Sequence, residues 1–136
     1  MISHPDFEFV DGWILRETKW NPEKEDTRAT VFALANGYMG CRGAFEEANP
    51  RTPYVVGNYI NGIYDTPLGK LTEREIVNIP DWHHVIVTID GEPFDMTTGE
   101  VLEYRRELDM RQGILRRCVR WKSPGGKVVR ICLLYT

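Results

Sequence analysis

NGYMGCRGAFEE, residues 36–47, is the stretch that decides the fold. It carries Gly37, Gly40 and Gly43 at steps of three, within a segment that otherwise has the apolar character of a β-strand. Glycine weakens a strand, because it loses more backbone entropy on folding and has no side chain to pack. Repeated glycine there therefore predicts a bulge, a tight bend or a close approach of two backbones.

Short strand-like runs lie on both sides of this stretch. Residues 13–15, 30–34 and 54–64 are rich in β-branched and aromatic side chains, which predicts strands. The polar segments 21–26 and 50–53 between them predict loops. No segment has the periodicity of a long amphipathic helix, so the sequence indicates an all-β fold.

The second half of the chain has a clearer strand pattern. Asp90-Gly91 predicts a hairpin turn after the alternating run 85–89. Apolar residues share one face of the next strand: Leu102, Tyr104, Leu108 and Met110. Charged residues fill the opposite face: Glu103, Arg105, Glu107, Asp109 and Arg111. This alternation is typical of a half-buried antiparallel strand, and Arg106 interrupts its apolar face.

Two further turns predict two further strands. Gln112-Gly113 and the turn 123–126 bound a strand whose inner face carries Leu115, Val119 and Trp121, with Arg117 among them. A final strand is expected over 128–134. Successive strands joined by short turns describe a meander within an antiparallel β-sandwich.

The net charge of −3 combines two unlike parts of the chain. Residues 1–104 carry 18 acidic and 8 basic side chains (−10), and residues 105–136 carry 2 acidic and 9 basic ones (+7). A basic end can indicate a polyanion partner. Strand alternation divides these basic residues between two faces, and no nucleic-acid motif is present, so cross-strand pairing with carboxylates is expected instead.

Composition predicts a cytoplasmic protein that does not enter a membrane. No run of 18 apolar residues exists, and the N-terminus lacks a basic region followed by an apolar one. Cys41, Cys118 and Cys132 are an odd number of cysteines at no metal-ligand spacing, which predicts reduced thiols.

Neither the paired carboxylates nor the histidines predict a catalytic or metal site. Adjacent residues of an extended chain point to opposite faces, so Glu46 and Glu47 are not expected to face one sugar, and a salt-bridge role is favoured. The same reasoning argues against a metal site at His83 and His84, and His4 lies near the N-terminus.

The tryptophans allow two interpretations. Trp13, Trp20, Trp82 and Trp121 could form a platform that stacks on the apolar face of a sugar, or they could fill the core. The core interpretation is favoured, with Trp82 as the exception. It follows Pro80-Asp81 at an expected bend, from which its side chain can project at the rim of the sheet.

Six blocks of this sequence, taken in order, resemble the N-terminal domain of the maltose, trehalose and kojibiose phosphorylases, glycoside hydrolase family 65. They are the opening strand with Trp13, Leu15 and Glu17, the segment 32–43 together with Glu46-Glu47, and the segments 61–65, 77–82, 90–94 and 108–117. Two features depart from the family pattern, namely Cys41 and the apolar end 131–136. The resemblance spans nearly the whole chain.

The resemblance implies a fold and an activity. The implied fold is a galactose-mutarotase-like super-sandwich, joined to an (α/α)6 barrel that carries the catalytic glutamate. The implied reaction is inverting phosphorolysis, or in a few relatives hydrolysis, of an α-linked glucose disaccharide, with inorganic phosphate as co-substrate. Neither the glutamate nor the phosphate site maps to this chain. Residues 1–136 are therefore expected to be a truncated, inactive N-terminal domain without catalytic residues, metal or cofactor.

Certain residues are expected to pack against the barrel or to shape the substrate entrance: Asn36, Tyr38, Arg42, Glu46, Glu47 and Trp82. Two alternatives stay open, a free-standing carbohydrate-binding module and a purely structural assembly domain. A partial sandwich would leave strand edges unpaired, which favours self-association. A strictly monomeric species in light scattering would contradict that expectation.

Overall fold

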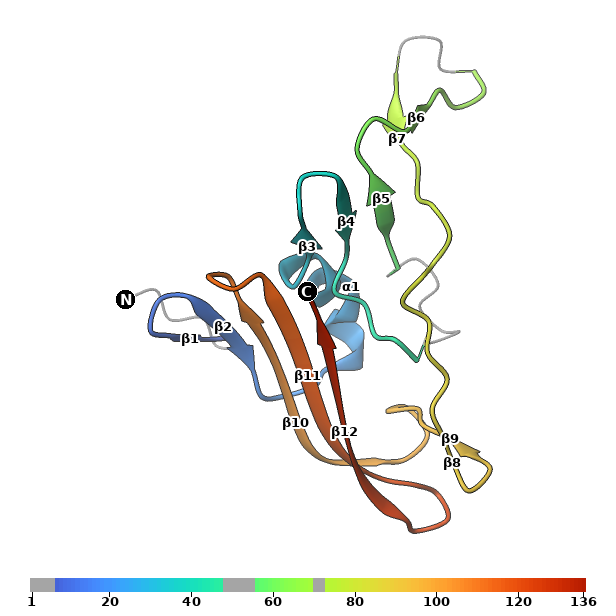
Figure 1. The fold of residues 1–136 in the computed structure, drawn as a ribbon. Coiled ribbons are helices and arrows are strands. Elements are labelled where there is room, and N and C mark those ends of the chain that lie inside the picture. The colour runs from blue at the N-terminus through green and yellow to red at the C-terminus, as the bar shows by residue number, and fades with distance from the viewer. Residues whose placement is uncertain (1–6, 48–55, 70–72) are drawn as a thin grey trace.

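Antiparallel sheets dominate the structure, a computed structural model that describes residues 7–47, 56–69 and 73–136 (Figure 1). His4 and the loop predicted at 50–53 lie outside the described residues. The largest sheet has five strands in the order β1-β2-β10-β11-β12. These strands span Glu8–Val10, Ile14–Glu17, Glu100–Asp109, Ile114–Lys122 and Val128–Tyr135.

The meander predicted for the last third of the chain is confirmed. β10, β11 and β12 pair antiparallel in sequence order. Gly113 and Gly126 supply the positive φ angles of the two turns, 66° and 88°. Among the described residues, β12 pairs only with β11, so its other edge is free of strand pairing.

The first half of the chain forms smaller sheets. β3, β4 and β5 (Leu34–Ala35, Met39–Cys41 and Asn58–Ile60) form a three-stranded sheet. β6 and β7 (Tyr64–Asp65 and Glu75–Ile76) pair with each other, as do β8 and β9 (Thr88–Ile89 and Glu92–Pro93). Asp90 and Gly91 join β8 to β9 with φ angles of 48° and 87°, which confirms the predicted hairpin.

A short helical segment replaces the predicted loop at 21–26 and the start of the strand predicted at 30–34. It consists of the 3₁₀ turn η1 (Pro22–Lys24) and the helix α1 (Glu25–Val31). The helical segment begins after Asn21 because the Asn21 side chain caps it, accepting a hydrogen bond from the Glu23 amide at 3.0 Å. Proline at the first position and acidic residues in the first turn favour the same helix start.

Two residues predicted on the apolar face of β10 are instead half-exposed. The register shifts between Val101, opposite Trp121, and Glu103, opposite Arg120, which leaves Leu102 as the extra residue of a bulge. Met110 lies beyond the end of β10, in the turn to β11. The period of two therefore fails at both ends of this strand.

The core lies on one face of the five-stranded sheet and consists of two apolar clusters. One contains Phe94, Met96, Tyr104, Val119 and Trp121. The other contains Leu15, Phe32, Leu108 and Leu115. Arg106 of β10 and Arg117 of β11 are register partners, and both are buried. They lie between a strand pair that belongs to the first cluster and a strand pair that belongs to the second. A band of charge therefore divides the core.

The prediction that all three thiols are reduced is wrong for two of them. Cys118 and Cys132 are register partners on β11 and β12, with Cα atoms 4.1 Å apart, and they form a disulfide. Their separation of 14 residues in sequence did not reveal this, because it becomes meaningful only once the turn fixes the pairing. Cys41 is a free, half-buried thiol whose pKa is raised by burial.

Candidate functional site

The glycine-rich stretch begins in the β3–β4 hairpin, contacts α1 at Gly43 and reaches the inner face of the large sheet at residues 45–47. The Gly43 amide donates to the Ala29 carbonyl at 2.8 Å. A Cβ atom at Gly43 would lie 2.5 Å from the Phe32 carbonyl oxygen, so only glycine fits without movement. Gly37 has φ of +86° in the turn between β3 and β4. The predicted tight bend and close backbone approach are therefore both present.

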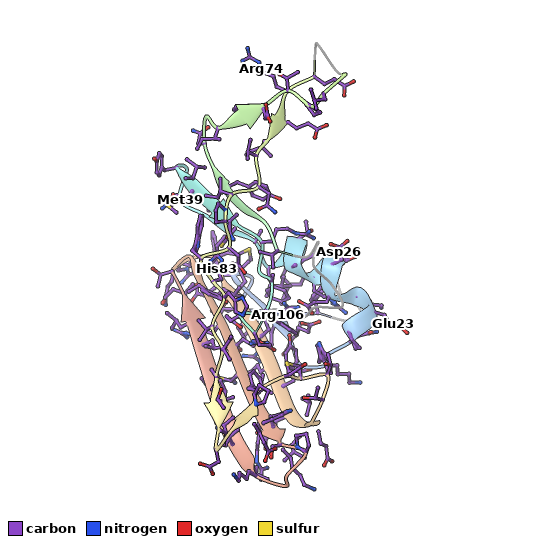
Figure 2. The ribbon with its side chains drawn as sticks, turned by 90° about the vertical axis from the view of Figure 1, so that its right-hand side faces the viewer. Glu23, Asp26, Met39, Arg74, His83 and Arg106 are labelled. Carbon is purple, nitrogen blue, oxygen red and sulfur yellow. A yellow bond between two sulfur atoms is a disulfide. The ribbon has the colours of Figure 1, made fainter. Side chains whose placement is uncertain are left out.

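Arg106 connects the sheet, the helix and the glycine-rich stretch (Figure 2). Its Nη2 donates to Glu17 at 2.9 Å, and its Nη1 donates to Glu25 at 2.9 Å and to the Gly43 carbonyl at 3.0 Å. The Tyr104 hydroxyl also donates to Glu17, at 2.9 Å. Burial disfavours the charge of Arg106, but these neighbours more than offset that effect and raise its pKa.

Glu25 makes this cluster sensitive to pH. Burial raises the pKa of Glu25 from 4.5 to about 7, although Arg106 opposes the shift. The folded state therefore keeps the Glu25 proton to a higher pH than the unfolded state does. The stabilisation of the folded state that this tighter proton binding gives is fully present below about pH 4.5 and is lost as the pH rises through about 7.

Replacing Glu25 with glutamine is expected to remove this pH dependence. The unfolding free energy of the wild type minus that of Glu25→Gln should fall by up to about 3 kcal/mol between pH 4.5 and pH 8. Urea unfolding at intervals across this range measures it. Glu23→Gln, on the exposed turn η1, is the matched control. A difference that stays constant with pH would contradict the assignment.

Arg117 binds both glutamates of the stretch. Its Nη2 contacts the Glu46 and Glu47 carboxylates, and its Nη1 donates to Glu47 at 2.8 Å. The expectation that the two side chains diverge is wrong, because residues 46–47 form a turn instead of an extended chain. The favoured salt-bridge role is confirmed. Burial opposes the charge of Arg117, whereas Glu47 and Glu46 raise its pKa above the ordinary value.

Phe45 lies between the buried arginines of β10 and β11, Arg106 and Arg117. Its ring centroid is 4.1 Å from the Arg117 guanidinium carbon and 4.9 Å from that of Arg106. An aromatic face attracts a cation, and this attraction is strongest where water is excluded. Together with the carboxylates, the ring separates two like charges on neighbouring strands and fixes the stretch to the sheet.

A hollow of about 690 Å³ opens beside this cluster. The β3–β4 hairpin, the bend at Trp82, the turn 112–113 and the end of β12 line it. Trp82 is 42% exposed at the predicted bend, and its Nε1 donates to His83 Nε2 at 3.0 Å. The His83 ring meets Tyr135 edge to face, with centroids 5.1 Å apart. The hollow therefore has one wall of orientated aromatic rings.

His83 acts in this wall as a neutral ring. Burial lowers the pKa of His83, although Asp81 and Glu46 oppose the shift. Since its Nε2 accepts from Trp82, the proton of the neutral ring lies on Nδ1, which is 3.7 Å from Asp81. The pair therefore presents an apolar indole face and no charge.

The structure brings only some of the predicted site residues together. Asn36 and Trp82 line the same hollow, and the Asn36 side chain accepts from the amides of Tyr38 and Met39 at 3.0 and 2.8 Å. Tyr38 lies at the exposed hairpin tip. Arg42 binds the Asp26 carboxylate of α1 at 2.8 Å instead. Glu46 and Glu47 are bound to Arg117, so neither is placed as a general acid.

Sequence reasoning missed two residues of the wall, His83 and Tyr135. His83 stands out in the sequence only as a possible metal ligand, and Tyr135 lies beyond the final predicted strand. The odd-numbered residues of β12 face inward, so a strand one residue longer would have placed Tyr135 beside the core. In the part of the chain that the structure describes, no group of three His, Cys, Asp or Glu residues could hold a metal.

The tryptophans and the basic end lie in contrasting surroundings. Trp121 is fully buried, as the core interpretation predicted, whereas Trp13 is 47% exposed under Arg111 and departs from it. On the outer face of the sheet, Glu103 accepts from Arg120 at 3.0 Å and from Arg130 at 2.8 Å, which confirms the predicted pairing.

Within the described ranges, no helix has the length and apolar character needed to span a membrane.

Comparison with known proteins gives a consistent result. The model of the glycosyl hydrolase family 65 N-terminal domain matches residues 15–133. The chain is 38% identical to the α,α-trehalose phosphorylase of Thermoanaerobacter brockii over 138 residues, which is 93% of this chain and 18% of that enzyme. It is 36% identical to the kojibiose phosphorylase of Halothermothrix orenii over 120 residues, 88% of this chain and 15% of that enzyme.

A solved structure has the same fold. It is assigned as a kojibiose phosphorylase from the human microbiome and superimposes with a TM-score of 0.81 at 21% identity. The match covers 95% of this chain and 18% of that one. The chain thus spans less than a fifth of the length of each of these three proteins.

Proposed function

This chain belongs to glycosyl hydrolase family 65, within its N-terminal domain, and from this premise we propose that it is a non-catalytic part of an α-glucoside phosphorylase. The names of two relatives, a trehalose and a kojibiose phosphorylase, support this function. The parent enzyme would use inorganic phosphate, or water in a hydrolytic relative, to cleave an α-linked glucose disaccharide. Catalysis would reside in a barrel domain outside this chain.

The hollow beside Trp82 is the observation that carries the proposed role. Its volume of about 690 Å³ lies in the range of small-molecule sites, roughly 300–1,000 Å³. It joins two segments that are distant in sequence, the hairpin with Asn36 and the bend with Trp82. An indole face held by His83 suits the apolar face of a pyranose ring. We infer that this wall borders the substrate entrance of the parent enzyme.

A chimera tests the proposal. The matching N-terminal residues of the T. brockii trehalose phosphorylase are replaced with this chain. We expect the chimera to release glucose 1-phosphate from trehalose and phosphate. Trp82→Ala in the chimera should raise the KM for trehalose about tenfold, as expected for loss of a well-placed aromatic contact. Tyr64→Ala, an exposed aromatic outside the hollow, should leave KM unchanged.

Two results would contradict this function. An inactive but folded chimera would show that the chain does not serve such an enzyme. If the chimera is active and Trp82→Ala leaves its KM for trehalose unchanged, the hollow does not border the substrate path. The assignment of the chain as part of such an enzyme would still stand.

The second candidate, a free-standing carbohydrate-binding module, rests on the same aromatic wall. Titrating the isolated chain with trehalose, kojibiose and maltose separates the two, because a wall that completes its site only in the parent enzyme should bind none of them measurably. Self-association, which the free edge of β12 favours, and a cytoplasmic location stay predictions.

A further inference from the structure

The disulfide lies on the outer face of the sheet, away from the hollow and the charged band. Cys118 and Cys132 occupy outward-facing positions of β11 and β12, where alternate residues point away from the core. Cys132 is exposed and Cys118 is half-buried. Solvent therefore reaches this pair, unlike a disulfide enclosed in a core.

The surroundings of the pair are positively charged. Cys118 lines a hollow of about 290 Å³ together with Arg105, Arg120 and Arg130. Two carboxylates offset part of this charge: Glu103 is paired with Arg120 and Arg130, and Glu107 lies 3.7 Å from Arg105, so three arginines face two carboxylates. Guanidinium groups stabilise a nearby thiolate, which is the reactive form of cysteine. They also attract anionic reactants to this smaller hollow beside Cys118.

We propose that Cys118 and Cys132 form a reversible redox modification site that exchanges with anionic low-molecular-weight disulfides. In the reduced pair, the exposed Cys132 thiolate attacks one sulfur of the small disulfide and releases one small thiolate. The Cys118 thiolate then attacks the Cys132 sulfur of this mixed disulfide and releases the second. Two protein thiols are oxidised, one small disulfide is reduced to two small thiols, and the reverse sequence restores the dithiol.

The site controls how firmly β12 is attached. β12 is an edge strand in the described structure, bonded to β11 alone, so the disulfide is its second connection to the sheet. The inward residues of β12 include Ile131, which packs on the core, and Tyr135, which lines the aromatic wall. Reduction should therefore loosen the strand that carries part of the proposed entrance.

The experiment equilibrates the Cys41→Ser chain with mixtures of reduced and oxidised glutathione and then alkylates the free thiols. Mass spectrometry should find molecules with both thiols alkylated or neither, in proportions set by the mixture. Cys118→Ser in the same background should trap a glutathione mixed disulfide on Cys132. Amide exchange of β12 should increase on reduction, whereas that of β2 should not.

The charge preference is tested with reactants of opposite sign. The rate constants of oxidised glutathione and of the dication cystamine are each divided by that of neutral hydroxyethyl disulfide. At low ionic strength, this ratio should be larger for oxidised glutathione by a factor on the order of ten, and the difference between the two ratios should shrink in high salt. Equal ratios for the two reactants would overturn the anionic preference. Absence of the internal disulfide at every mixture, or independent reaction of the two thiols, would overturn the site itself.

Discussion

Arg106→Ala is expected to lower the free energy of unfolding by about 3–5 kcal/mol, the usual cost of leaving buried charges without their partner. Arg106 is 1% exposed and binds Glu17, Glu25 and the Gly43 carbonyl. Its removal takes the guanidinium donors away from buried Glu25 and from the Gly43 carbonyl, whereas Glu17 keeps Arg28, at 3.0 Å, and the Tyr104 hydroxyl, at 2.9 Å, as partners. Since domains are stable by only about 5–15 kcal/mol, this single change should bring the fold close to its limit.

Urea unfolding followed by tryptophan fluorescence measures the effect. Arg105→Ala is the matched control, because Arg105 is the adjacent residue on the solvent face and pairs only loosely with Glu107, at 3.7 Å. That change should stay within about 0.5 kcal/mol. A double variant, Arg106→Met with Glu25→Gln, should recover part of the loss, because it removes the uncompensated charge of Glu25 and keeps Glu17 paired with Arg28, at 3.0 Å. Equal losses for Arg106→Ala and Arg105→Ala would contradict the role of the cluster.

Gly43→Ala should cost about 3 kcal/mol, near the upper end of overpacking effects. The added methyl would lie 2.5 Å from the Phe32 carbonyl oxygen and 2.7 Å from the Phe32 Cβ, so backbone must move. That movement would pull the Gly43 carbonyl away from Arg106 and the amide away from Ala29.

Gly40→Ala is a control within the same stretch. Its added methyl would meet the Ala35 side chain at 3.4 Å, an ordinary contact, and Gly40 is not at positive φ. Thermal unfolding should show a lower midpoint for Gly43→Ala and a midpoint near wild type for Gly40→Ala. If both substitutions were equally tolerated, the close approach at Gly43 would not be a constraint on the fold.

The parts of the fold that could be predicted from sequence are those with local signals. The β10–β12 meander follows from a period of two and from glycines in turns, and the β8–β9 hairpin follows from Asp90-Gly91. The helix α1 was missed because it is only 7 residues long, too short to show a periodic apolar face, although Asn21 and Pro22 were capping signals.

The candidate site could be predicted only in part, because it depends on contacts between distant segments. The bend and the exposure of Trp82 followed from its neighbours in sequence. The convergence of Glu46 and Glu47 on Arg117 did not, since a turn at 46–47 and a strand 70 residues away are both required. Arg106 appeared in the sequence as an interruption of an apolar face, which was a usable signal of a buried ion pair.

The charged band that divides the core also limits how this domain can change during evolution. Losing Arg106 or Arg117 alone costs a large share of the total stability, and losing a carboxylate alone leaves an arginine without a full set of partners. Substitutions in the set Glu17, Glu25, Arg28 and Arg106 should therefore be inherited together, as should those in the set Glu46, Glu47 and Arg117. An ancestral lineage that converted one set to apolar residues would have needed an interval in which selection on stability was relaxed.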